Sequence, residues 1–283
     1  MLKKKIVLLI VVVLLANLFV FATVNATTEL DSVKIDIGAG QRIIKLADGR
    51  IKPINPQVLS QEQRAIVLKE MGFNELDLKE MPDDIAISII KNGGKKVELN
   101  LLDFHVSSNL PENDSSDVGI YNVTTPIFTQ WSVYIDIVNN GTSYYYDFYS
   151  KYEWTNYTNT YYKDITAMAW ENDYTVHAGV GGYVAKYYLV PNWYDVWKYV
   201  DLSSVYGTSM TFDMKYAQKQ YGYIRERIFI PISRGGSQGV FAWRYGHSAL
   251  PGTPSASIGP LSISFSGLSG TEWSGRYGFT IGQ

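Results

Sequence analysis

Residues 130–154, QWSVYIDIVNNGTSYYYDFYSKYEW, decide the fold. Asn140-Gly141 is the strongest short signal for a β-hairpin turn, because both central positions of a type I′ turn need positive φ. A turn here sets Asn139 opposite Thr142, and side chains then alternate between an apolar face and a mixed aromatic face. The predicted pairs are Ile137–Tyr144, Ile135–Tyr146, Val133–Phe148 and Trp131–Ser150 on the apolar face, and Asp136–Tyr145, Tyr134–Asp147 and Ser132–Tyr149 on the other.

The chain from residue 127 to residue 283 continues this alternation of apolar and polar residues. Nine or ten segments have the period of two that is typical of strands, and no long helical pattern interrupts them. We therefore predict an antiparallel two-sheet β-sandwich over residues 127–283, preceded by a small helical module. The clearest alternating segments are residues 164–171, 183–190, 206–223, 224–232, 239–245 and 261–266.

Residues 27–108 form the predicted N-terminal segment, which carries start and stop signals for three short helices. Ser60 with Gln63 is a capping box, and Gly72 ends the first helix. Asn74 can cap a second helix, and Pro82 suits the first turn of a third. The expected small core of this module comprises Leu68, Met71, Phe73, Leu76, Leu78, Ile85 and Ile89.

Residues 109–126 are polar, acidic and rich in turn formers, which predicts a linker. Three of its acids, Glu112, Asp114 and Asp117, could supply oxygen ligands to Ca²⁺. Their spacing matches no known calcium loop, so a solvated linker is the favoured interpretation. We expect no metal and no cofactor.

The first 26 residues have the pattern of a secretory signal peptide. Lys3, Lys4 and Lys5 precede an apolar run over residues 6–21, and Ala26 ends a small-residue cleavage site. The run is short for a retained membrane anchor. We expect cleavage after Ala26 and a secreted protein. The chain has no cysteine, which excludes disulfides and thiol chemistry.

Composition and motifs argue against several function classes. The net charge is −2, without the basic field that nucleic acid needs. His105, His177 and His247 lack zinc-site spacing, and there is no nucleophile elbow or phosphate loop. The expectation is a protein without enzymatic activity, although an unrecognised carboxylate pair stays open. Its nominal members are Glu153, Asp164, Glu171 and Asp173, and a buried Glu226 would have a raised pKa.

Aromatic residues supply the candidate ligand-binding site. The chain holds 22 Tyr, 7 Trp and 11 Phe, and residues 190–199, VPNWYDVWKY, concentrate them behind a loop-forming Pro191. Each ring has an apolar body and Trp and Tyr have a polar tip, which suits sugars or lipid headgroups. The alternative is that these rings plug the end of the sandwich. The candidate ligand-binding residues are Trp193, Tyr194, Trp197, Tyr199, Tyr145 and Tyr149.

Two resemblances accompany this interpretation. Tyr152-x-Trp154, followed by the run DITAMAW at residues 164–170, resembles uncharacterised exported proteins of low-GC Gram-positive bacteria. That resemblance implies a helical N-terminal part, an aromatic-rich β C-terminal part and export, but no activity. Residues 190–199 resemble the aromatic loop of actinoporin-type membrane-binding sandwiches, although the long amphipathic N-terminal helix of that family is missing.

Two functions follow as hypotheses. The first is an exported module that binds surface glycan or the cell envelope through exposed aromatics. The alternative is a membrane-active protein related in action to β-pore-forming toxins, for which residues 206–223 could supply a membrane hairpin. Glycan binding predicts coplanar exposed rings on one face. Membrane action predicts exposed rings at one tip together with an amphipathic hairpin held away from the core.

Overall fold

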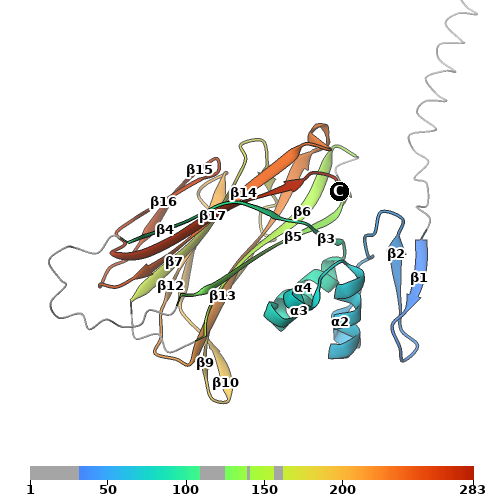
Figure 1. The fold of residues 1–283 in the computed structure, drawn as a ribbon, viewed down its shortest axis with the longest axis horizontal. Helices are drawn as coiled ribbons and strands as arrows, with labels where there is room; N and C mark the ends of the chain where they lie inside the picture. Colours follow the sequence, from blue (N-terminus) through green and yellow to red (C-terminus); the bar gives the residue numbers. More distant parts are fainter. Residues whose placement is uncertain (1–31, 109–124, 139–140, 156–161) are drawn as a thin grey trace, which may run out of the picture.

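The computed structural model describes residues 32–108, 125–138, 141–155 and 162–283. It is an antiparallel β-sandwich with a helical module beside it (Figure 1), as predicted. The predicted signal peptide, almost all of the predicted linker and its three acids lie outside the described residues. Among the described residues, no helix combines the length and the apolarity that crossing a membrane requires.

Two large sheets make the sandwich. The first sheet has the order β10-β9-β13-β6-β5-β3, with β8 also on β13, and the second has the order β11-β12-β7-β14-β17-β4. Strands of the first sheet are β3 (Lys95–Val97), β5 (Ile127–Val138), β6 (Ser143–Trp154), β8 (Thr175–Val176), β9 (Gly182–Leu189), β10 (Asn192–Asp195) and β13 (Lys219–Pro231). Strands of the second are β4 (Asn100–Ser108), β7 (Lys163–Trp170), β11 (Lys198–Asp201), β12 (Gly207–Asp213), β14 (Gln238–Ser248) and β17 (Gly270–Thr280).

Two hairpins stay outside these sheets. One comprises β1 (Ser32–Asp36) and β2 (Arg42–Leu46), close to the N-terminus of the described chain. The other comprises β15 (Ser255–Gly259) and β16 (Ser262–Ser266), and Figure 1 shows it lying along the second sheet. A short turn η3 (Ile232–Arg234) follows β13.

The interior between the sheets is built largely of rings. Phe148 of the first sheet stacks on Phe241 of the second with ring centroids 4.8 Å apart, and Tyr152 stacks on Phe212 at the same distance. Such pairs add about 0.5–1.5 kcal/mol each beyond the area they bury. The many aromatics therefore serve first as the packing material of a chain without disulfides.

The helical module covers the outer face of the first sheet and creates a second core. It contains η1 (Pro56–Val58), α2 (Gln61–Glu70), α3 (Glu75–Glu80) and α4 (Asp83–Asn92). Both predicted caps exist: Ser60 and Gln63 form a capping box, and Asn74 caps α3. Most of the expected core residues are buried, but Leu76 is exposed. The second core joins Val67, Ile85, Ile89 and Ile90 to Trp131, Val133 and Tyr149 of the sheet.

The predicted register of the β5–β6 hairpin is right near the turn and wrong beyond it. Ile137 faces Tyr144 and Asp136 faces Tyr145, as expected. A register shift between Tyr134 and Asp136 then moves every later pair by one residue. The bulge leaves the extra residue unpaired and changes which residues share a face. The observed pairs are Tyr134–Tyr146, Val133–Asp147, Ser132–Phe148, Trp131–Tyr149 and Gln130–Ser150.

The bulge matters because β5 and β6 are covered on both sides. Trp131, Val133 and Tyr149 pack against the helices, whereas Tyr146 and Phe148 pack into the sandwich. Residues 95–108 of the N-terminal segment form strands in addition to the predicted helices. They divide between β3, which pairs with β5, and β4, which pairs with β17. The N-terminal segment thus supplies an edge strand to each large sheet.

Candidate functional site

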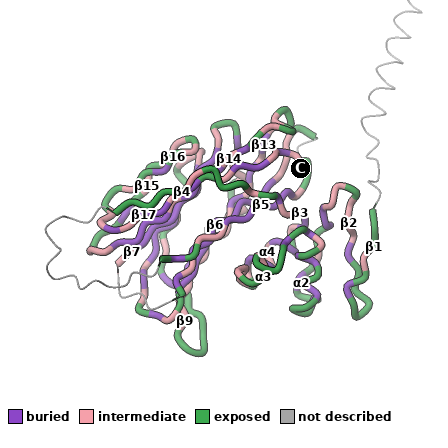
Figure 2. Tube along the Cα trace, in the orientation of Figure 1, coloured by how far each residue is buried: buried purple, intermediate pink, exposed green. Residues whose placement is uncertain are grey.

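The aromatic segment forms a hairpin at one edge of the sandwich. β9 and β10 pair through Leu189–Asn192 and Tyr188–Trp193, which leaves Val190 and Pro191 as a two-residue turn. Because Tyr188 is the last residue of β9 that pairs with β13, the end of the hairpin extends beyond the sheet. Figure 1 shows it projecting, and Figure 2 shows its end as exposed chain. We call residues 187–194 the aromatic tip.

The two faces of the aromatic tip carry different rings. On one face, Trp193 stands edge-on to Tyr221 at 4.8 Å between centroids and lies 5.2 Å from Tyr188. On the other face, Tyr194 stacks on Tyr187 at 5.4 Å. Trp193 is 42% exposed and Tyr194 is 45% exposed. Each exposed ring is thus held by a neighbouring ring rather than left free to rotate.

After β10, the chain passes from the edge of the first sheet to the edge of the second. Val196 is buried in the main core, whereas Trp197 and Tyr199 point outward with 51% and 59% exposure. Lys163 Nζ lies 4.1 Å from the Trp197 ring, a cation–π contact. The alternative in which the rings plug the sandwich is therefore wrong, because the rings of this segment are exposed.

Charge is absent from the aromatic tip and present at its root. Residues 187–194 contain no Asp, Glu, Lys, Arg or His. At the root, Lys186 Nζ lies 3.6 Å from Asp84 Oδ2, and the Tyr221 hydroxyl donates to the same carboxylate at 3.3 Å. Burial and the Asp84 charge raise the pKa of Tyr221, so this phenol stays neutral. The tip can therefore leave water at little electrostatic cost.

Tyr145 and Tyr149 lie elsewhere. Tyr149 is fully buried beneath α4, with its hydroxyl 3.3 Å from Ser88 Oγ, so this candidate cannot offer its ring to a ligand. Tyr145 stacks on Phe229 at 4.9 Å and contacts His177 Nδ1 through its hydroxyl at 2.6 Å. Of the six candidates, Trp193, Tyr194, Trp197 and Tyr199 are exposed along one stretch of chain, whereas Tyr145 and Tyr149 lie apart from it.

The four nominal carboxylates do not share one site. Glu171 and Asp173 lie close together because both bind Arg234, whereas Glu153 binds Lys151. Asp164 is fully buried and accepts hydrogen bonds from Tyr245 and from the Ser248 amide. No group of three or more His, Cys, Asp or Glu that could hold a metal occurs in the described part of the chain.

Glu226 is the buried acid that the sequence singled out. It faces the interior together with Ile224 and Ile228 and accepts a hydrogen bond from Tyr183 of β9. Burial raises its pKa to about 7, against the opposing effects of Tyr183 and Arg225. Because burial disfavours the charged form, the protonation of Glu226 affects the stability of the fold.

The β15–β16 hairpin is the amphipathic element that sequence reasoning missed. The alternation at residues 261–266 predicts a strand, but it does not show that this strand lies outside the two large sheets. The segment that had been expected to act as a membrane hairpin, residues 206–223, instead contributes to the main core. Its β12 lies between β11 and β7, with Met210, Phe212 and Met214 buried.

Comparisons with known proteins give no family. No protein-family model matches the chain, and no curated protein matches it. Among solved structures, the membrane-inserted NetB toxin of Clostridium perfringens matches with a TM-score of 0.27 and 7% identity, over 54% of this chain and 86% of that one. AvmM, which catalyses macrocyclization in alchivemycin A biosynthesis, matches with a TM-score of 0.20 and 8% identity, over 55% and 89%. Likenesses at these TM-scores show neither a shared fold nor a shared activity.

Proposed function

We propose that this protein is exported and docks on a lipid bilayer through its aromatic tip. The observation that carries the proposal is a projecting hairpin whose turn and flanks are exposed, apolar or aromatic, and uncharged. Leu189 and Val190 are 44% and 67% exposed beside Trp193 and Tyr194. Trp and Tyr favour the headgroup region, where the ring body leaves water and the polar tip keeps a hydrogen bond.

The arrangement of rings favours membrane over glycan. A sugar-binding platform needs rings that lie flat on one face, but Trp193 stands at 84° to Tyr221. The Trp193 and Tyr194 side chains also point to opposite faces of β10. Rings pointing both ways around a protruding turn suit immersion in an interface better than stacking on one sugar face.

One observation keeps glycan binding as a second candidate. Trp193 and Tyr221 lie beside Asp84 and Lys186, so an exposed ring has polar groups near it. Rings flanked by hydrogen-bonding groups are a common way to hold a sugar. The two candidates therefore share Trp193 and differ in the surface to which it binds.

Sedimentation with two kinds of partner tests the proposal. The mature protein is mixed with neutral phosphatidylcholine vesicles or with insoluble cell-wall polysaccharide. We expect it to pellet with vesicles and the Trp193→Ala/Tyr194→Ala variant to lose about 100-fold in affinity, the equivalent of roughly 3 kcal/mol of ring burial. The matched control is Leu101→Ala/Phe104→Ala, two side chains of similar exposure on β4 at the opposite edge of the second sheet.

Each outcome is informative. Loss of vesicle binding in the Trp193→Ala/Tyr194→Ala variant alone supports docking by the tip. Binding to polysaccharide that depends on the same two rings would replace the proposal with the second candidate. Equal loss in both variants, or binding to neither material, would contradict docking by the tip.

A further inference from the structure

The β15–β16 hairpin is bound to the sandwich more loosely than the strands of the large sheets are. Its strands pair with each other from Ser255–Ser266 to Gly259–Ser262, and among the described residues they share a ladder with no other strand. The hairpin lies over the outer face of the second sheet (Figure 1). It therefore has its own small cluster of apolar contacts, separate from the two main cores.

The sequence of this hairpin is amphipathic and uncharged. Residues 248–271 contain no Asp, Glu, Lys, Arg or His. The serines of both strands are exposed, whereas Ile263 is buried and Ile258 and Phe265 are half-buried against the sheet. An uncharged alternation of serine with apolar residues gives a strand pair one face for water and one face for hydrocarbon.

The apolar surface beneath the hairpin is made of small residues, and Arg244 lies beside it with its guanidinium 5.5 Å from the Phe265 ring. Ala167, Ala169 and Ala242 form it, with Gly246 nearby, where an added Cβ would come within 2.6 Å of Leu268 Cδ2. Short side chains let the hairpin lie close to the sheet but bury little area. Because burial stabilises in proportion to area, this interface contributes much less than the ring-filled main core.

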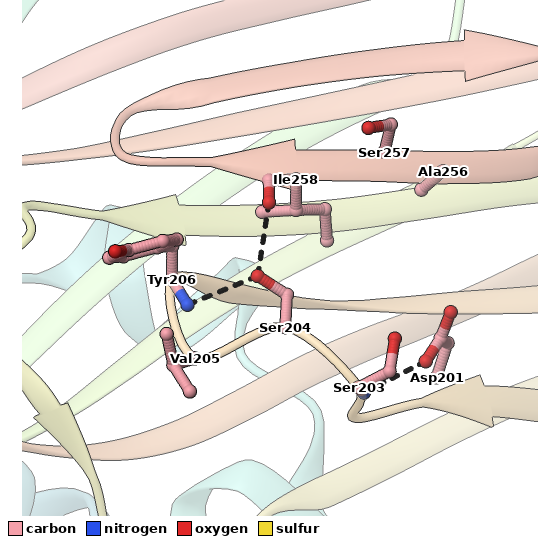
Figure 3. A pocket seen from close by; sticks show the side chains of 8 residues that line it. All are labelled: Asp201, Ser203, Ser204, Val205, Tyr206, Ala256, Ser257 and Ile258. Carbon is pink, nitrogen blue, oxygen red and sulfur yellow. Dashed lines mark hydrogen bonds between the residues drawn. The ribbon is translucent and has the colours of Figure 1, made fainter.

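Few polar contacts fasten the hairpin to the sheet. Leu261 N donates to Trp170 O at 3.1 Å, Arg244 Nη1 donates to Ile263 O at 2.6 Å, and Ser204 Oγ donates to Ile258 O at 3.1 Å. Figure 3 shows the last of these within a pocket of about 420 Å³ between residues 201–206 and β15. Residues 256–258 of the hairpin thus border a hollow on one side, although Ile258 also packs closely over Gly207.

The base of the hairpin lies at the same end of the sandwich as the exposed tryptophans. β14 and β17 pair as far as Ser248–Gly270, where the hairpin begins. Ser248 Oγ donates to Lys163 O at 2.5 Å, and the Lys163 side chain covers Trp197. The ring of the neighbouring His247 lies 4.7 Å from the Trp154 ring. Trp154 pairs with Gln220 of β13, and the adjacent residue of β13, Lys219, pairs with Tyr188 of the tip.

The turn of the hairpin, in contrast, lies at the far end. Leu261 bonds to Trp170, the last residue of β7, whereas Lys163 is the first. The hairpin is therefore folded back along the sheet from its base, pointing away from the surface on which we expect the tip to dock. Rotation about residues 249–254 and 267–269 would direct it the other way, as an extension of the β14–β17 ladder.

We infer that docking of the aromatic tip is followed by release of the β15–β16 hairpin, which inserts its apolar face into the lipid hydrocarbon. This inference rests on the proposed docking. The strands of five residues extend about 17 Å, so the hairpin is too short to span the ~30 Å hydrocarbon core. Its outer edges carry unpaired backbone groups that hydrocarbon does not tolerate, so these edges stay in the headgroup region. The apolar face exchanges contact with an alanine surface for contact with acyl chains, and no charged side chain is buried.

Single-cysteine labelling tests the insertion, since the natural chain contains no cysteine. Ala256→Cys and Ser257→Cys place an environment-sensitive dye on adjacent residues of β15 that point to opposite faces. Ala256 borders the pocket, so the dye has room in the folded-back state. A Ser237→Cys variant reports on a turn outside the hairpin. Docking on neutral phosphatidylcholine vesicles is scored separately, by sedimentation of the same labelled samples.

We expect vesicles to raise dye emission at position 256 at least about twofold more than at position 257, because only one face of an inserted strand meets lipid. Position 237 should not respond. Docking with no response at position 256 would overturn the insertion while leaving the docking intact. An equal response at positions 256 and 257 would also overturn it, because the apolar face would then have no special role. Absence of docking would refute the proposed function, and the insertion with it.

Discussion

The two hairpins that lie at the margins of the sandwich are stabilised in opposite ways. β9–β10 is anchored in the first sheet through β13 and exposes its rings, whereas β15–β16 has no ladder to either large sheet and turns its apolar side chains toward alanines. The first is rigid and apolar on the outside. The second is loosely held and apolar on the inside. A fixed contact surface and the hairpin that we propose to be released thus occur in one molecule, with the tip and the base of that hairpin at the same end of the sandwich.

Ionisation of Glu226 should give the largest effect, because this carboxyl lies between the elements that support both hairpins. Glu226 accepts a hydrogen bond from Tyr183 of β9. A hydrogen bond from Thr208 lowers the pKa of Glu226, and Thr208 follows Gly207, which lies close to Ile258 of β15. Burial raises its pKa to about 7, so the folded form keeps a proton that the unfolded form releases near its ordinary pKa of 4.5. Stability should therefore fall as the pH rises from about 4.5 to 7, by on the order of 3 kcal/mol.

The Glu226→Gln variant checks this expectation. A neutral amide has no proton to lose, so the urea midpoint of the variant should change less between pH 5 and pH 8 than that of wild type. Glu98→Gln, at an exposed position, serves as the control. An unchanged pH dependence in Glu226→Gln would show that this buried carboxyl is not the group responsible.

A smaller change should loosen one hairpin and spare the other. In Gly246→Ala, the new Cβ would lie 2.6 Å from Leu268 Cδ2 and 3.1 Å from Phe265 Cδ2, so both must shift away from the sheet. We expect a cost of about 1 kcal/mol and faster amide exchange in β15–β16, with β9–β10 unchanged. Gly259→Ala is the matched control, since its Cβ meets nothing within 4 Å. Equal loosening of both hairpins would contradict their independence.

Salt should have the smallest effect on docking. The aromatic tip carries no acid or base, so its attraction to neutral vesicles does not depend on long-range charge. Raising the ionic strength from about 0.05 to 0.5 M should change vesicle affinity by less than about twofold. A steep loss of affinity with salt would instead assign docking to the charged residues at the root, such as Lys186.

The sequence predicted those features that depend on local signals. Ser60, Gln63 and Asn74 occupy cap positions, and Pro191 starts the turn that exposes Trp193. The features it missed depend on distant contacts. No glycine or proline marks the bulge beside Ile135, and nothing local shows that helices cover Tyr149. The isolation of β15–β16 is likewise invisible, because an alternating strand has the same pattern whether or not it joins a large sheet.

Amide exchange of the full chain, with and without neutral vesicles, tests docking and insertion most directly. We expect slower exchange over residues 187–194 on vesicle binding, together with a change over residues 255–266, while β6 and β14 stay as they are. Protection at the first segment alone would support docking and contradict insertion. Exchange at residues 187–194 that is the same with and without bound vesicles would contradict the aromatic tip as the membrane-binding surface.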